Sequence, residues 1–101
     1  MGFRDAQRRL IAALEEGRYG FEARDALEEK NLLAIGEVSA EFVILLLGRC
    51  KGTQYRESPH DFDREIVVHT FLPETAGGRW YIKAYFLSDD AVFISVHRAG
   101  R

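Results

Sequence analysis

The chain has 101 residues, of which 47% are hydrophobic and 30% are charged, and its formal net charge is −2. This balance indicates one globular domain spanning residues 1–101 and excludes a disordered segment, whereas a nucleic-acid binder would usually carry a basic excess. The single cysteine, Cys50, excludes an intrachain disulfide, and the longest apolar run, 42–47, is too short to span a bilayer. We therefore expect a cytoplasmic protein with no membrane segment.

Two helices are predicted before residue 32. Apolar residues recur at helical spacing over 5–16, which predicts an amphipathic helix that Gly17 ends. The same spacing over 21–30 predicts a second, shorter helix, and Asn31 suits the left-handed conformation that often ends a helix.

A third helix is predicted from Ser39, a good N-cap residue, to about Arg49. The apolar run 42–47 inside it, taken alone, could equally be a buried strand. Residues 51–63 are then expected to form turns and a loop, in which His60 and its acidic neighbours are more typical of a solvated turn than of a metal site.

After Arg64 the period of the apolar residues changes from helical to two, which predicts three strands. Pro73 ends the first strand, a turn at 76–78 precedes the second, and a turn at 88–90 precedes the third. The expected fold is therefore α+β, with two or three N-terminal helices packed on one face of a C-terminal antiparallel sheet of at least three strands. The residues expected to face the helices are Ile66, Val68, Thr70, Trp80, Ile82, Ala84, Phe86, Val92, Ile94 and Val96.

The length of each turn decides which side chains share a face, because residues opposite each other in an antiparallel pair point the same way. A three-residue turn at 88–90 pairs Tyr85 with Phe93, Lys83 with Ser95 and Tyr81 with His97, whereas a two-residue turn would put His97 in the core. The same argument on the other side places His69 opposite Tyr81 or Lys83. The uncovered face is therefore expected to gather His69, Arg79, Tyr81, Lys83 and His97.

These side chains favour phosphoryl chemistry. Two imidazoles titrate near neutrality and can exchange acid and base roles, while lysine and arginine can hold a phosphate. Such chemistry requires neither a metal nor another cofactor. The plainer interpretation is that an uncovered sheet face must be polar, and that Tyr, Lys and His are ordinary occupants of it.

Several stretches resemble one family. They include Leu-Ile-Ala-Ala-Leu-Glu-Glu-Gly at 10–17, Tyr-Ile-Lys at 81–83 and Ile-Ser-Val-His at 94–97. The last two are similar to the Tyr-Leu-Lys and closing Val-Ser-Phe-Lys of the MqsR toxins, which belong to the RelE-like group of metal-independent endoribonucleases from bacterial toxin-antitoxin pairs. The family's active face combines a lysine, a glutamine, a tyrosine and a second lysine. By resemblance these fall on Arg56, Val68 or neighbouring His69, Tyr81, and His97.

The resemblance implies an RNA-cleaving toxin with a cognate antitoxin. His69 or His97 would act as general base or acid in the attack of a 2′-hydroxyl on the adjacent phosphate, and Tyr81 would orient the phosphate or the leaving oxygen. The side chains expected to bind the phosphate are Arg56, Arg79 and Lys83. The alternative is a non-catalytic interaction domain, whose open face or edge strand binds a partner protein through exposed aromatic residues. The residues expected to form that aromatic patch are Phe71, Tyr85 and Phe93.

Overall fold

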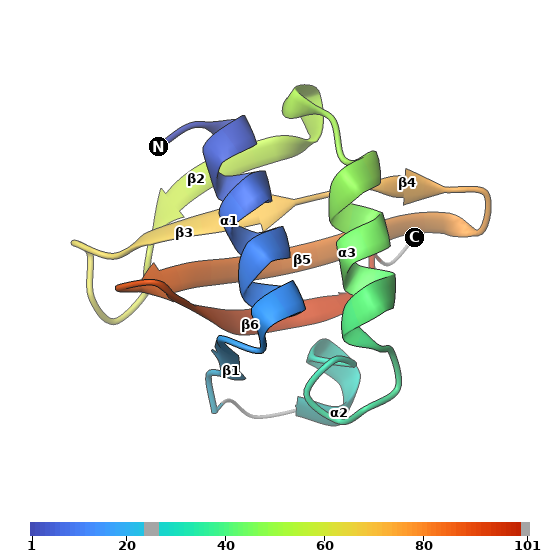
Figure 1. Ribbon diagram of the computed structural model, residues 1–101, viewed down its shortest axis with the longest axis horizontal. Coiled ribbons are helices and arrows are strands. Elements are labelled where there is room, and N and C mark those ends of the chain that lie inside the picture. Colours follow the sequence, from blue (N-terminus) through green and yellow to red (C-terminus); the bar gives the residue numbers. More distant parts are fainter. Residues whose placement is uncertain (24–26, 100–101) are drawn as a thin grey trace.

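Two long helices lie side by side across one face of a twisted β-sheet (Figure 1). The structure is a computed structural model that describes residues 1–23 and 27–99. The α+β class, with N-terminal helices on one face of the sheet, is confirmed. In chain order the elements are α1 (Phe3–Glu16), β1 (Tyr19–Phe21), α2 (Leu27–Lys30), α3 (Ala40–Arg49), the 3-10 turn η1 (Gly52–Gln54), β2 (Tyr55–Pro59), β3 (Val67–Phe71), β4 (Glu74–Thr75), β5 (Gly78–Leu87) and β6 (Asp90–Arg98).

In the described part of the chain the sheet has six strands, in keeping with the expected minimum of three, but it is mixed and not purely antiparallel. Its strand order is β1-β6-β5-β3-β2, with β4 paired to β5 outside this path. All neighbouring strands are antiparallel except β1 and β6, which run parallel. The prediction of a loop over 51–63 is wrong in part, because residues 55–59 form the edge strand β2 against β3.

The predictions for α1 and α3 are confirmed. Gly17 follows α1 with φ 72°, a left-handed conformation that glycine adopts without a steric penalty. The Ser39 side chain accepts a hydrogen bond of 3.1 Å from the Phe42 backbone N–H at the start of α3, so the run 42–47 is helical. The two helices bury Ala6, Leu10, Ala13, Leu14, Val43, Leu46 and Leu47.

The prediction of a helix over 21–30 is largely wrong. Its first residue belongs to β1, and only its last turn is helical, as α2; residues 24–26 lie outside the described part of the chain. Asn31 does not end a helix in the left-handed conformation. It is fully buried instead, where its Nδ2 donates to the Phe93 carbonyl (3.1 Å) and its Oδ1 accepts from the Ala34 N–H (3.1 Å). Asn31 therefore holds the segment that follows α2 against β6.

The turn between β4 and β5 consists of residues 76–77 alone, one residue fewer than expected. This register continues into β3, so His69 lies opposite Ala84 and not opposite Tyr81 or Lys83. Because a shift of one residue moves every side chain to the other face, the face assignment predicted for the whole of β3 is reversed.

The turn between β5 and β6 is also one residue shorter than expected, with only residues 88–89 between the paired Leu87 and Asp90. Phe93 is consequently opposite Ala84 and faces the helices, and its predicted pairing with Tyr85 is wrong.

A β-bulge then restores the predicted pairs farther along β6. Ile94 is an extra residue in β6 at the point where the register shifts between Lys83 and Ala84. Beyond it, Lys83 pairs with Ser95 and Tyr81 with His97, as predicted. These two pairs thus arise from a short turn followed by a bulge, and not from a three-residue turn.

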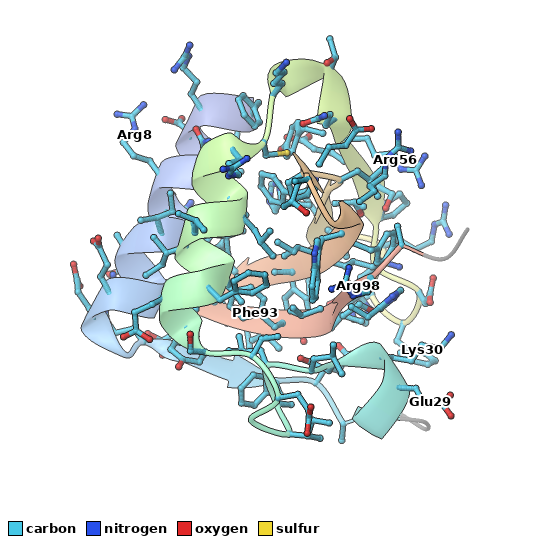
Figure 2. All side chains as sticks on the ribbon, turned by 90° about the vertical axis from the view of Figure 1, so that its right-hand side faces the viewer. Arg8, Glu29, Lys30, Arg56, Phe93 and Arg98 are labelled. Carbon is cyan, nitrogen blue, oxygen red and sulfur yellow. The ribbon has the colours of Figure 1, made fainter. Side chains whose placement is uncertain are left out.

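The sheet therefore has a helix-covered face and an open face, the latter defined as the face turned away from α1 and α3. Buried residues such as Phe71, Ile82 and Phe93 pack against the helices in the main core. Figure 2 shows Phe93 between α3 and the sheet, whereas Arg56 lies on the far side of the molecule from Arg8 of α1.

Candidate functional site on the open face

A row of polar residues crosses four strands of the open face. Arg56 of β2 lies opposite Thr70 of β3, Thr70 lies opposite Lys83 of β5, and Lys83 lies opposite Ser95 of β6. Neighbouring side chains in such a row are separated by about 5 Å at their Cβ atoms. The register therefore brings two cations and two hydroxyl groups together on one surface.

Tyr81 and His97 form a second pair beside this row. They are directly opposite each other, and their rings stack with centroids 5.1 Å apart and an interplanar angle of 30°. His97 Nδ1 is 2.8 Å from the Arg98 carbonyl oxygen. Since a carbonyl oxygen can only accept, Nδ1 carries the proton, and in the neutral ring Nε2 keeps a lone pair for a ligand or a proton.

The cations of this surface are available to a ligand. Within the described ranges, neither Arg56 nor Lys83 forms an ion pair with another residue. Arg79, which was also expected to bind phosphate, is paired instead with Glu74 of β4 through a contact of 2.6 Å. Both side chains of that pair are 54% exposed, so Arg79 is part of a surface ion pair at the margin of the open face.

The predicted place of His69 on the open face is wrong. His69 is 2% exposed on the helix-covered face, where its Nδ1 is 2.8 Å from the Tyr55 hydroxyl. That hydroxyl also lies 2.6 Å from a Glu57 carboxylate oxygen, which can only accept. Tyr55 therefore donates to Glu57 and accepts from His69. Burial lowers the pKa of His69, and burial together with the hydrogen bond to Glu57 raises the pKa of Tyr55.

The aromatic patch predicted for a partner protein is not present. Phe71 and Phe93 have no exposed surface and belong to the core beneath the helices. Of these three aromatic residues, only Tyr85 lies on the open face, and it is 8% exposed.

One end of the open face is closed by a buried polar cluster that the sequence pattern did not indicate. Glu22 Oε1 accepts from Tyr85 Oη (2.9 Å) and lies 2.7 Å from His60 Nε2. Because the Phe62 backbone N–H donates to His60 Nδ1 (3.0 Å), Nε2 carries the His60 proton. His60 is 5% exposed, so it does not sit in a solvated turn as expected. The His60 ring also lies edge-on to that of Tyr85, with centroids 5.1 Å apart, and Tyr85 packs in a small apolar group with Val68 and Ile94.

Cys50 is 5% exposed and packs in the main core as a small apolar side chain. Burial raises the pKa of its thiol, which disfavours the nucleophilic thiolate. No cluster of three metal-ligating side chains occurs among the residues that the structure describes. In the same part of the chain, no helix has the length and apolar character needed to cross a membrane.

Comparisons with protein-family models and with curated protein sequences produced no match to this chain. The resemblance to the MqsR toxins therefore depends on the residues quoted above alone. When Val68 is taken for the glutamine position, all four positions of that resemblance lie on the open face. Arg56 is part of the polar row, Tyr81 and His97 lie beside it, and Val68 belongs to the closed end of the face.

Proposed function

We propose that this protein is a metal-independent endoribonuclease, with its active surface on the open face around Tyr81 and His97. The observation that carries the proposal is the stacked Tyr81–His97 pair next to Lys83, which has no ion-pair partner among the described residues. A base, an orienting hydroxyl and a fixed cation are groups that can together catalyse RNA transesterification.

In the proposed reaction, His97 Nε2 takes the proton of a ribose 2′-hydroxyl. The 2′-oxygen then attacks the adjacent phosphorus, and the bond from phosphorus to the 5′-oxygen of the next nucleotide breaks. Lys83 stabilises the negative charge of the pentavalent intermediate, while Tyr81 orients the leaving oxygen, which takes a proton from solvent. The products are a 2′,3′-cyclic phosphate and a 5′-hydroxyl end.

His69 has no role in this proposal, because it is buried on the helix-covered face and its polar contacts are with Tyr55 and Glu57. One imidazole, rather than the two expected, is therefore assigned to the reaction. The glutamine of the family pattern also has no counterpart, since Val68 is 1% exposed and apolar.

The proposal is tested by incubating the purified protein with single-stranded RNA in excess EDTA and analysing the ends of the fragments. His97→Ala should lower the rate by about 100-fold or more, as expected for loss of a general base, and Tyr81→Phe should also slow cleavage. Arg8→Ala is the matched surface control, because Arg8 is exposed on the opposite side of the molecule (Figure 2). Cleavage that survives both open-face substitutions would overturn the site assignment.

The same proposal includes a cytoplasmic toxin-antitoxin role, in which a cognate antitoxin protein restrains the RNA-cleaving activity. Expression of the chain should arrest growth, His97→Ala should relieve the arrest, and the product of an adjacent gene should form a stable complex with it. A non-catalytic interaction domain is the weaker alternative, because two of the three aromatic residues on which it depended are in the core. A stable complex without RNA cleavage at any concentration would favour that alternative.

A further inference from the structure

Thr70 is a nearly buried residue whose hydroxyl has no partner. It is 2% exposed, and its side chain forms no hydrogen bond with any residue that the structure describes. Among those residues, no side-chain oxygen or nitrogen that is fully buried lacks a hydrogen bond. The small exposed part of Thr70 therefore includes its hydroxyl, which opens onto the floor of the open face.

Two cations flank this hydroxyl. Arg56 lies directly opposite Thr70 on one side and Lys83 on the other, each at a cross-strand separation of about 5 Å. A hydroxyl donor between a guanidinium and an ammonium matches a tetrahedral oxyanion, since guanidinium binds two phosphate oxygens through its fork and the other two groups donate to further oxygens.

The position of Thr70 separates it from the groups assigned to the reaction. His97 is two strands away and two residues farther along β6, which corresponds to about 12 Å between the Cα atoms. A phosphate bound at Thr70 is thus not the scissile phosphate next to His97 Nε2. Lys83 lies between the two positions.

We propose that Arg56, Thr70 and Lys83 form a phosphate subsite for an RNA phosphodiester next to the scissile one. The inference rests on the proposed function for the identity of the ligand, but the subsite itself is defined by the register and the unpartnered hydroxyl. In this subsite, Thr70 positions the RNA strand and contributes to the affinity for substrates longer than a dinucleotide.

Thr70→Val removes the hydroxyl and keeps the shape of the side chain, and Thr70→Ser restores the hydroxyl. Thr70→Val should reduce kcat/KM by about 10-fold on a tetranucleotide, mainly through KM, because it removes a hydrogen bond to a charged group. It should leave cleavage of a dinucleotide, which has only the scissile phosphate, unchanged. Thr70→Ser should retain wild-type behaviour on both. Equal losses on the two substrates, or no loss on either, would overturn the subsite.

Binding measured without cleavage keeps the subsite distinct from the proposed reaction. The probes are inorganic phosphate and a 2′-deoxy tetranucleotide. Their binding is monitored through the NMR chemical shifts of the Thr70 and Lys83 backbone amides. We expect both probes to shift these amides, the tetranucleotide at lower concentration, and Thr70→Val to weaken binding of the tetranucleotide about 10-fold. Shifts in a protein that cleaves no RNA would refute the proposed function alone, whereas cleavage with neither the shifts nor the loss of affinity would refute the subsite alone.

Discussion

Phe93→Ala tests the register of β6, on which the composition of the open face depends. Phe93 has no exposed surface, and its ring lies 6.0 Å from that of Tyr19 at an interplanar angle of 89°. Truncation of a buried phenylalanine removes its apolar contacts and leaves a cavity, at a cost of about 3 to 5 kcal/mol. Since a domain of this length is stable by roughly 5 to 15 kcal/mol, much of the free energy of unfolding should be lost.

The assay is urea unfolding followed by circular dichroism, together with the thermal midpoint, which should fall by about 12 °C or more. Phe62→Ala is the matched control, because it makes the same chemical change at a side chain that is 84% exposed. It should cost at most about 1 kcal/mol. If Phe93→Ala costs no more than Phe62→Ala, Phe93 is not in the core, and the two-residue turn at 88–89 and the bulge at Ile94 fail with it.

Three further substitutions test other contacts by urea unfolding. His69→Gln should remove a pH-dependent loss of stability: burial holds the folded pKa of His69 below the ordinary histidine value of 6.5, so the unfolded chain binds more protons and stability falls as the pH drops below 6.5. The stability difference between wild type and His69→Gln should therefore shift between pH 7 and pH 5, and a constant difference would contradict this reasoning. Ser39→Ala should cost about 1 kcal/mol through loss of the α3 cap, and an unchanged midpoint would count against that cap. Tyr85→Phe should cost about 1 to 2 kcal/mol, since its hydroxyl donates to the Glu22 carboxylate; no cost would mean that this bond does not hold the closed end.

Local pattern was sufficient to predict the two long helices and the three C-terminal strands. Apolar spacing identified α1 and β5, and the residues Gly17 and Ser39 marked helix ends through chemistry that acts within a few residues. The pairs Tyr81 with His97 and Lys83 with Ser95 were also correct. Their correctness depended on Ile94, because the bulge compensated for a turn that was predicted one residue too long.

The features that were missed depend on partners distant in sequence. β1 pairs with β6, about 70 residues later, and has only three residues, so it carries no alternation of its own. β2 is a polar edge strand that ends at Pro59, which gives the composition of a loop. His60 is buried because it contacts Glu22 and Tyr85, which are distant in sequence. His69 lies on the opposite face from the predicted one because the turn between β4 and β5 is one residue shorter than expected. The subsite at Thr70 followed from the same change of face.

The central claim is that the Tyr81–His97 pair on the open face cleaves RNA. The most direct measurement compares the wild-type protein with His97→Ala on one single-stranded RNA in excess EDTA, with both proteins shown to unfold at closely similar temperatures. We expect wild-type fragments that end in a 2′,3′-cyclic phosphate, and cleavage about 100-fold slower or more in the variant. Equal cleavage by the two proteins, or intact RNA with the wild type, would contradict it.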